Sequence, residues 1–243
     1  MARLLVPGPL QPGRLQLPAG AARHLKVLRL RPGDALTLFD GSGGEWQARL
    51  AAEPDQVELL QHLALERELE PALTLAVGMP ANERMDALVE KATELGAAAL
   101  QPLMTARSVL KLDGERAARR TEHWRGVAAA ACEQCGRNRL PSIALPLQLS
   151  AWLGRLPAAA PGTLRLLLAA PSQGRAASLT ELGPELDTAT SVLALSGPEG
   201  GFSSAEIGLA QQLGFQPLSL GARVLRADTA PLALLAALAA RRA

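Results

Sequence analysis

From Leu73 onward, short apolar runs alternate with segments in which apolar residues recur at helical spacing. This alternation predicts an α/β domain with a parallel sheet covered by helices, because parallel strands need long crossover connections. We expect strands at 73–78, 98–103, 143–147, 164–170, 192–196 and 216–220. Helices are expected at 82–95, 115–135, 203–214 and 229–241.

Two of these helices carry recognisable end signals. Asn82 can cap the first and Gly96 suits the left-handed position that ends it, while Ser203 and Glu206 form a capping box at the start of the third. The last helix is apolar almost all round, so it must be buried in the core or against a second subunit.

The first 70 residues have a different pattern, with short strand-like segments at 14–17, 35–39, 45–51 and 56–63. Three glycines follow Asp40 within four residues and supply the positive φ angles of a hairpin. Between the segments, 24–30 is expected to form a short amphipathic turn. We therefore expect a small barrel at 1–70 and the parallel-sheet domain at 71–243.

Length and composition favour a globular, cytoplasmic protein. The chain has 243 residues of which 48% are hydrophobic, enough for sizeable cores. It has no uninterrupted apolar run of 18 residues, and Pro7 interrupts the apolar start, so neither a membrane span nor a signal peptide is expected.

Cys132 and Cys135 are the only cysteines, which excludes a disulfide framework. Their spacing would suit a redox pair or part of a metal site, but they end a helical stretch instead of beginning one, and no histidine has ligand spacing. We expect two small core residues one helical turn apart, and no metal.

Basic residues are concentrated in two stretches although the formal net charge is only +2. Six basic residues and no acid lie between Arg3 and Arg31, and eight lie between Arg107 and Arg139. Either stretch could contact phosphate groups or could simply be a solvated face. With three tryptophans, three phenylalanines and no tyrosine, RNA binding would be electrostatic and not based on stacking.

A glycine-rich turn at 195–202 follows an expected strand and precedes a capped helix. Ligands of open α/β sheets bind beyond the carboxyl ends of the strands, and glycines there let the backbone approach a nucleoside closely. The sequence Ser196-Gly197-Pro198-Glu199-Gly200-Gly201 is neither a Walker A loop nor a dinucleotide-binding G-x-G-x-x-G, which disfavours phosphate binding. A tight connection without a ligand is the alternative.

A second loop, 218–231, follows the next strand and brings Arg223, Arg226, Asp228 and Thr229 to the start of the last helix. These groups could serve a reaction at the same sheet edge. In the alternative interpretation, Asp228 or Thr229 only caps the helix and both arginines are solvated.

Together the two loops resemble those of the RsmE family of 16S ribosomal RNA (uracil-N3)-methyltransferases, members of the SPOUT class. The similarity lies in Ser-Gly-Pro-Glu-Gly-Gly-Phe-Ser at 196–203 and Leu-Gly-Ala-Arg-Val-Leu-Arg-Ala-Asp-Thr-Ala at 220–230, and extends to 24–29, 33–34, 40–41, 91–96, 107–108 and 133–137. It covers nearly the whole chain in order. Two positions depart from the family: Asp228 where Glu is more common, and Ala106 where an acid commonly stands.

The resemblance implies an N-terminal PUA-like barrel that helps to hold RNA and a SPOUT-type domain with a trefoil knot that forms homodimers. The implied activity is methylation of uridine N3 in 16S rRNA or the small ribosomal subunit, with S-adenosylmethionine as methyl donor cupped mainly by backbone. The expected cofactor-binding residues are Leu195, Ser196, Gly197, Pro198, Glu199, Gly200, Gly201, Leu218, Leu220, Gly221, Val224, Leu225, Arg226, Thr229 and Ala230.

The expected catalytic residues are Arg226, which would stabilise negative charge on the base, and Asp228 or Glu199, which would accept or orient the proton. The expected RNA-binding residues are Arg3, Arg23, His24, Lys26, Arg29, Arg107 and Arg137. Two alternatives stay open: another methylation on the same scaffold, such as ribose 2′-O-methylation, and a non-catalytic RNA-binding assembly factor. A nucleotide-dependent oxidoreductase is disfavoured by the missing dinucleotide motif.

Overall fold

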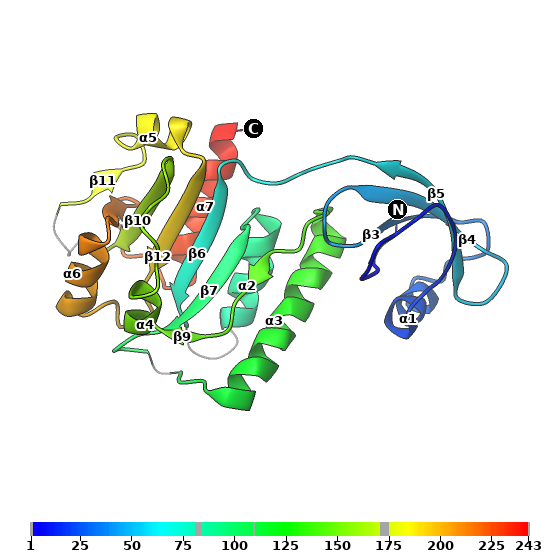
Figure 1. The fold of residues 1–243 in the computed structure, drawn as a ribbon, viewed down its shortest axis with the longest axis horizontal. Coiled ribbons are helices and arrows are strands. Elements are labelled where there is room, and N and C mark those ends of the chain that lie inside the picture. Colours follow the sequence, from blue (N-terminus) through cyan, green and yellow to red (C-terminus); the bar gives the residue numbers. More distant parts are fainter. Residues whose placement is uncertain (1, 81–83, 109, 171–174, 243) are drawn as a thin grey trace. The chain divides into compact units, whose positions relative to one another are not determined.

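The computed structural model describes residues 2–80, 84–108, 110–170 and 175–242 (Figure 1). The chain divides into two compact units, Met1–Glu68 with Ala129–Leu140 and Leu69–Ala128 with Pro141–Ala243. This division differs from a boundary at residue 70 because a segment far along the chain, 129–140, groups with the N-terminal residues.

The larger unit contains an eight-stranded sheet in which every paired strand is parallel to its neighbour. Its main path has the order β11-β13-β10-β12-β6-β7-β8, and β9 pairs with β7. The strands are β6 (Ala72–Gly78), β7 (Ala99–Met104), β8 (Ser142–Ile143), β9 (Leu147–Gln148), β10 (Thr163–Ala169), β11 (Ala177–Ser178), β12 (Ser191–Ser196) and β13 (Gln216–Ser219). The parallel α/β sheet expected from the alternating pattern is confirmed.

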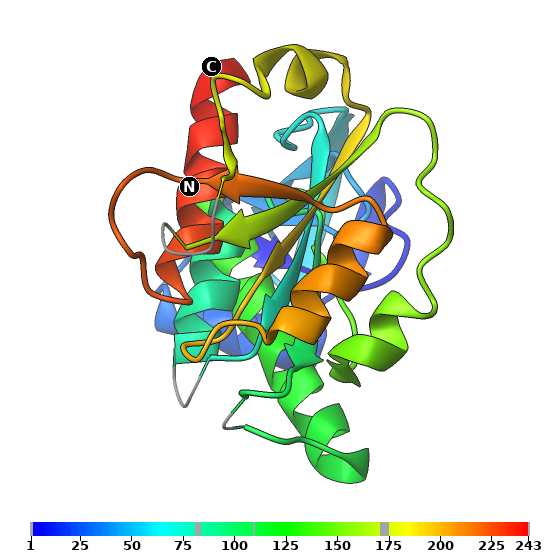
Figure 2. The ribbon, with the colours of Figure 1, turned by 90° about the vertical axis from the view of Figure 1, so that its left-hand side faces the viewer.

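Helices cover both faces of this sheet (Figure 2). They are α2 (Arg84–Glu94), α3 (Gly114–Cys135), α4 (Leu149–Leu153), α5 (Gly183–Thr188), α6 (Ser204–Gln212) and α7 (Thr229–Arg242). Figure 2 shows α2 and α7 on one face and α4 and α6 on the other. Among the described residues, no helix has both the length and the apolar character needed to cross a bilayer.

Strand residues alternate between two apolar cores, one on each face of the sheet. In β6, Leu73, Leu75 and Val77 contribute to the core under α2 and α7, and Ala76 contributes to the core under α4 and α6. A strand that is buried on both faces consists of consecutive apolar residues, and these apolar runs made the strands predictable from the sequence. Helix α7 buries Leu234, Leu235 and Leu238 in the first core, so the unit's own sheet covers much of its apolar surface.

The helix end signals behave as expected where the structure describes them. Gly96 has φ 92° after α2, and Ser203 and Glu206 form both hydrogen bonds of a capping box at α6. Asn82, the expected cap of α2, lies outside the described residues.

The strand expected at 143–147 is instead two short strands, β8 and β9, so this expectation was wrong. Their common neighbour β7 contains Pro102, which has no N–H to donate to a continuous ladder. Between β8 and β9, the side-chain amide of Gln101 donates to the carbonyl of Leu145 at 2.9 Å. A side chain thus replaces the missing ladder hydrogen bond. Strand β11 and helices α4 and α5 were not anticipated either.

Arg165 of β10 is a charged residue in the core, only 6% exposed. Its guanidinium donates to the carbonyls of Leu213 (2.7 Å) and Pro157 and lies 5.8 Å from the ring centre of Phe215. Leu213 is the C-cap residue of α6, where the negative end of the helix dipole favours a cation. Arg165 therefore connects the end of α6 and the loop that contains Pro157 to the sheet.

We expect Arg165→Met to lower the free energy of unfolding by about 2–3 kcal/mol, because two carbonyls lose a charged donor and one helix end loses its cation. Urea unfolding of the variant and the wild type measures this difference. A variant as stable as the wild type would mean that the buried charge costs as much as its hydrogen bonds contribute.

The smaller unit contains a five-stranded sheet of order β1-β3-β4-β5-β2. Its strands are β1 (Ala2–Leu5), β2 (Gly13–Gln16), β3 (Ala35–Phe39), β4 (Glu45–Leu50) and β5 (Gln56–Leu63). β1 pairs parallel to β3 and was not expected, whereas the other four strands match the expected segments closely. Leu4, Leu36, Leu38 and Val57 are among the core residues of this unit.

The amphipathic turn expected at 24–30 is a full helix, α1 (Ala19–Val27), so the expected start was too late. Pro18 occupies the N-cap position and three small residues follow it within the first turn, which the apolar spacing alone did not reveal. Arg29 ends the turn with φ 54°. Ala22 and Leu25 are buried, while Val27 is 73% exposed.

Glu45 is the centre of a partly buried ion-pair cluster in this unit. Arg3 donates to its carboxylate at 2.7 Å and Arg67 at 3.1 Å, and Arg3 also donates to the side chain of Asn138 at 2.7 Å. Burial by itself would raise the pKa of Glu45, but the hydrogen bonds from Arg3 and Arg67 outweigh it and hold this pKa below its ordinary value of 4.5.

A carboxylate with a lowered folded-state pKa stabilises the protein above its unfolded pKa and loses that contribution as the pH falls through the folded pKa. We therefore expect the stability advantage of wild type over Glu45→Gln to be full near pH 7 and to shrink below pH 4.5. Urea unfolding of both proteins between pH 7 and pH 3 measures it. A difference that does not change with pH would show that Glu45 contributes through packing alone.

The two cysteines belong to the smaller unit, at the end of α3. Cys132 is fully buried, and this burial raises the pKa of its thiol to about 12, so it is not a reactive thiolate. Cys135 is partly buried. In the described ranges, no three His, Cys, Asp or Glu side chains gather as metal ligands would.

Candidate functional site

A pocket of about 340 Å³ lies at the carboxyl ends of β10, β12 and β13. β10 lies between the other two strands in the sheet, so the three loops that follow these strands meet at one edge. The lining residues are Arg84, Leu168, Ala169, Ala170, Ser196, Gly197, Pro198, Glu199, Gly201, Phe202, Leu220, Gly221, Arg223, Val224, Leu225, Arg226, Ala227 and Ala230. We refer to 196–202 as the glycine loop and to 220–228 as the arginine loop.

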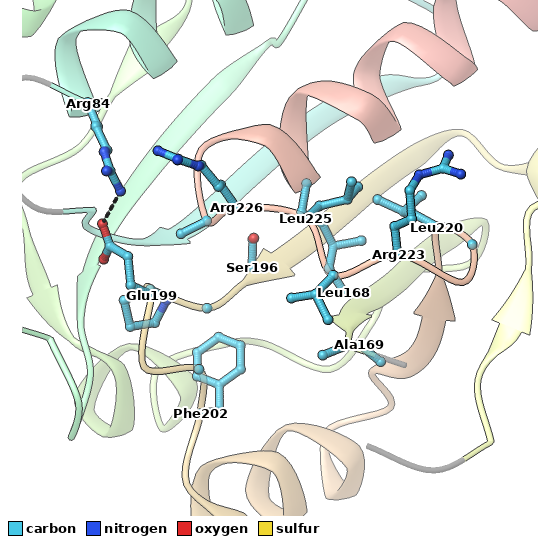
Figure 3. Close-up of a pocket in the computed structure, with 18 residues that line it drawn as sticks. Arg84, Leu168, Ala169, Ser196, Glu199, Phe202, Leu220, Arg223, Leu225 and Arg226 are labelled. Carbon is cyan, nitrogen blue, oxygen red and sulfur yellow. Dashed lines mark hydrogen bonds and ion pairs between the residues drawn. The ribbon is translucent and has the colours of Figure 1, made fainter. Parts of the chain in front are cut away.

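Three of the four charged lining residues lie at one end of the pocket, and the fourth, Arg223, lies on the opposite side (Figure 3). At the end with three charged residues, Arg84 reaches from the start of α2 to the carboxylate of Glu199, with 3.3 Å between Nη1 and Oε1, and the side chain of Arg226 points toward the same end. Arg223 points away from this group in the figure. The remaining wall is largely apolar, including Leu168, Ala169 and Phe202, so the pocket suits a ligand with one polar end and one apolar body.

The glycine loop is tightly folded and closely packed. Gly201 has φ 65°, and its N–H donates to the carbonyl of Pro198 at 2.8 Å. Gly78, at the end of the neighbouring β6, supports the loop from below: a Cβ on Gly78 would lie 2.7 Å from the backbone nitrogen of Pro198. Only a glycine at position 78 lets the loop approach this strand so closely.

The arginine loop presents backbone to the pocket at Gly221, which has φ 108° and no heavy atom of the described residues within 4 Å of the place of a Cβ. Its last turn is closed by the N–H groups of Thr229 and Ala230, which both donate to the carbonyl of Arg226 at 3.0 Å. Asp228 lies within this turn, and its Oδ1 atom is buried without a hydrogen-bond partner among the described residues. A buried acceptor without a donor is costly unless a bound group supplies one.

Most of the residues expected to bind a cofactor line this pocket: Ser196, Gly197, Pro198, Glu199, Gly201, Leu220, Gly221, Val224, Leu225, Arg226 and Ala230. Leu195 and Leu218 do not; they are core residues, 1% and 0% exposed. Gly200 and Asp228 belong to the two loops and Thr229 begins α7, but none of the three is among the lining residues.

Several lining residues were missed by the sequence analysis. Leu168 and Ala169 end β10 and Ala170 directly follows it, but the end of this strand had not been considered as part of a site. A signal was available, because the carboxyl end of any strand between two loop-bearing strands must lie at the same edge. Arg84 was missed because it comes from a helix far away in sequence. Arg223 had been considered only for a reaction at this sheet edge, and Phe202 and Ala227 had been noted only within the family motifs.

The expected RNA-binding residues fall into two groups. Arg23, Lys26 and Arg29 are exposed on α1 and the turn after it, and Lys26 forms an exposed ion pair with Asp55 at 3.3 Å. His24 lies 3.6 Å from Glu133, with its side chain 41% exposed. These side chains are accessible to an RNA backbone.

Arg3 and Arg137 are placed differently. Arg3 is 14% exposed at its side chain and bonds Glu45, while Arg137 is 3% exposed and forms an ion pair with Glu68. Both guanidinium groups are used inside the smaller unit, which favours a structural role for them. Arg107, in the larger unit, is exposed and donates to the carbonyl of Gly200 at 2.9 Å.

Two family models match the chain. The RNA methyltransferase domain matches residues 67–239, and the RNA methyltransferase PUA domain matches residues 17–60. The α/β sheet and the small N-terminal β unit thus correspond to the two domains of one class of RNA-modifying protein.

Curated relatives and solved structures agree with these models. The chain is 38% identical to ribosomal RNA small subunit methyltransferase E of Synechocystis over 87% of this chain and 67% of the relative, and 30% identical to that of Bacillus subtilis over 88% and 84%. A Neisseria gonorrhoeae structure of the same name, bound to S-adenosyl methionine, superposes with TM-score 0.88 at 33% identity over 99% and 98% of the two chains. A Legionella pneumophila structure described as a putative methyltransferase with SAM gives TM-score 0.86 at 35% identity over 99% and 97%. The similarity first seen in the two loops is therefore confirmed over the whole chain, which belongs to the ribosomal RNA small subunit methyltransferase E family.

Proposed function

We propose that this protein transfers a methyl group from S-adenosylmethionine to N3 of a uridine in 16S rRNA of the small ribosomal subunit, in the cytoplasm. The pocket carries this proposal, since it joins the glycine and arginine loops at one sheet edge with Arg226 at its charged end.

The residues present fit S-adenosylmethionine. Gly221 offers open backbone, and Leu168 and Leu220 offer an apolar surface for an adenine ring. Backbone groups of the glycine loop and of Val224 and Leu225 would hold the nucleoside and the amino-acid part. When bound, this cofactor supplies an electrophilic methyl group on a sulfonium centre.

Arg226 would stabilise the base as its N3 proton leaves. Uracil N3 carries a proton at neutral pH, so methylation at N3 requires removal of that proton, and the resulting negative charge spreads to the carbonyl oxygens beside N3. Arg226 is exposed in the free protein, and its guanidinium would lower the energy of such an anion once bound cofactor and RNA exclude water from the pocket. Arg226 belongs to the loop that forms one wall of the pocket and points into its charged end.

Of the two candidate carboxylates, Asp228 has the stronger case as proton acceptor or orienting group. Its Oδ1 is buried without a partner in the described chain, whereas Glu199 is already engaged by Arg84. The shorter side chain of Asp, compared with the Glu common in the family, places this oxygen one methylene closer to the backbone. Glu199 would then fix Arg84 at the pocket mouth.

RNA would be bound mainly through phosphate contacts. Arg23, Lys26 and Arg29 supply accessible positive charge on the PUA-like unit, and His24 lies beside them in sequence. When binding depends on phosphate contacts, the affinity for RNA falls steeply as the salt concentration rises.

We further propose that the α/β domain has the trefoil knot of the SPOUT class and that the protein acts as a homodimer. The family resemblance supports both statements. Light scattering of the purified protein tests the second, and a monomeric mass at micromolar concentration would contradict it.

The deciding experiment is mass spectrometry of nucleosides from 16S rRNA treated with the protein and S-adenosylmethionine, as free RNA and as small subunits. 3-Methyluridine is expected. A 2′-O-methylated nucleoside would replace the proposed reaction by the ribose alternative. An absence of methylation together with no S-adenosylmethionine binding in calorimetry would favour an RNA-binding assembly factor.

A further inference from the structure

The glycine loop contacts a third loop that the pocket itself does not include. This β7 loop, residues 105–108, follows the carboxyl end of β7, two strands away from β12 in the order β12-β6-β7. Two residues that do not line the pocket connect these segments. Arg107 donates a hydrogen bond to the glycine loop, and Glu206 of α6 accepts hydrogen bonds from the β7 loop and from the end of the glycine loop at Ser203.

Arg107 reaches the middle of the glycine loop. Its Nη1 donates to the carbonyl of Gly200 at 2.9 Å, and a Cβ on Gly200 would lie 3.0 Å from the Cβ of Arg107. The two backbones are therefore in direct contact, and the guanidinium fixes the direction of the Gly200 carbonyl.

Glu206 of α6 joins the β7 loop to Ser203, the residue that directly follows the glycine loop. One carboxylate oxygen accepts from the backbone N–H of Ala106 at 2.8 Å, and the other accepts from the backbone N–H of Ser203 at 2.7 Å. The Glu206 carboxylate, which completes the capping box of α6, thus also binds the β7 loop. At position 106 the contact uses backbone, so the alanine there can make it as well as any residue.

The β7 loop is itself fixed by its own hydroxyl groups. Ser108, which is buried, accepts from the N–H of Thr105 at 2.9 Å, and Thr105 Oγ1 accepts from the N–H of Arg107 at 3.3 Å. The loop is thus a folded turn suited to hold the position of another segment.

We infer that Arg107 and Glu206 are positioning residues that hold the glycine loop in its ligand-binding conformation before the cofactor arrives. This inference rests on the proposed use of the pocket for S-adenosylmethionine. Together with Gly78 below Pro198, they fix the loop from two sides. A loop ordered in advance loses less conformational entropy on binding and binds more tightly.

The experiment compares Arg107→Ala, Arg107→Lys and Glu206→Gln with Arg155→Ala, a matched control whose exposed arginine does not line the pocket. Calorimetry without RNA is expected to show S-adenosylmethionine affinity about five- to tenfold weaker in Arg107→Ala. Arg107→Lys should recover part of the loss because an ammonium can still donate to the Gly200 carbonyl. Glu206→Gln should weaken binding too, since an amide can accept at only one of the two contacts.

Hydrogen exchange of the apo proteins gives a second readout that needs no ligand. Amides 199–202 should exchange faster in Arg107→Ala and Glu206→Gln than in wild type, with the melting temperature of Arg107→Ala unchanged. Unchanged exchange in these amides would overturn the inference, even if wild type failed to bind S-adenosylmethionine and the proposed function were wrong. Unchanged cofactor affinity with a raised KM and a reduced salt dependence for RNA would also overturn it and make Arg107 an RNA contact.

Discussion

Replacing Arg226 by alanine is expected to lower kcat for methylation by about 100- to 1000-fold, the usual effect of removing one preorganised charge donor from a reacting anion. Affinity for S-adenosylmethionine should be largely retained, because the proposed cofactor contacts of this loop are mainly backbone. Single-turnover methylation of 16S rRNA and calorimetry with the cofactor measure the two effects separately.

Two further variants sharpen this test. Arg226→Lys keeps the charge but not the planar fork, and is expected to recover only part of the rate. Arg155→Ala removes an exposed arginine outside the pocket and should leave kcat unchanged. Full turnover by Arg226→Ala would refute the role assigned to Arg226.

Replacing Gly78 by alanine should disrupt cofactor binding from outside the pocket. The added methyl would lie 2.7 Å from the Pro198 nitrogen, so either the glycine loop or the end of β6 must move. We expect a loss of about 1–3 kcal/mol in stability from overpacking and at least about a tenfold loss in S-adenosylmethionine affinity. Thermal unfolding and calorimetry on the same preparation measure both.

Gly126→Ala is the matched control for this substitution. Gly126 is exposed within α3, and no heavy atom of the residues that the structure describes lies within 4 Å of a Cβ placed there. The same methyl group should here raise stability by about 1 kcal/mol through helix propensity and leave cofactor affinity unchanged. Wild-type affinity in Gly78→Ala would show that the loop tolerates displacement.

The elements that the sequence predicted well are those whose pattern has one physical cause. Strands such as β6 and β12 are buried on both faces, so their sequences consist of consecutive apolar residues. The capping box at Ser203 and Glu206 is a local hydrogen-bonding pattern that needs no tertiary information. Both glycine-bearing loops were placed correctly because they directly follow such strands.

Features that depend on contacts between distant segments were not predictable. The interruption between β8 and β9 depends on Pro102 in a neighbouring strand, and Arg84 reaches the pocket from a helix more than a hundred residues before Glu199. The core positions of Leu195 and Leu218 depend on which face of the sheet each residue meets. The ion pairs of Arg3 with Glu45 and of Arg137 with Glu68 were not predictable, because the sequence shows charge but not the carboxylate opposite it.

The long helix α3 makes the linear order of the chain a poor guide to where it can be cut. Its final residues and the segment up to Leu140 supply Asn138 to Arg3, Arg137 to Glu68 and Glu133 to the Leu5 amide. A fragment ending near residue 70 would leave those groups facing water and should not fold by itself. Recombination between relatives can therefore exchange the N-terminal module only if the segment 129–140 is exchanged with it.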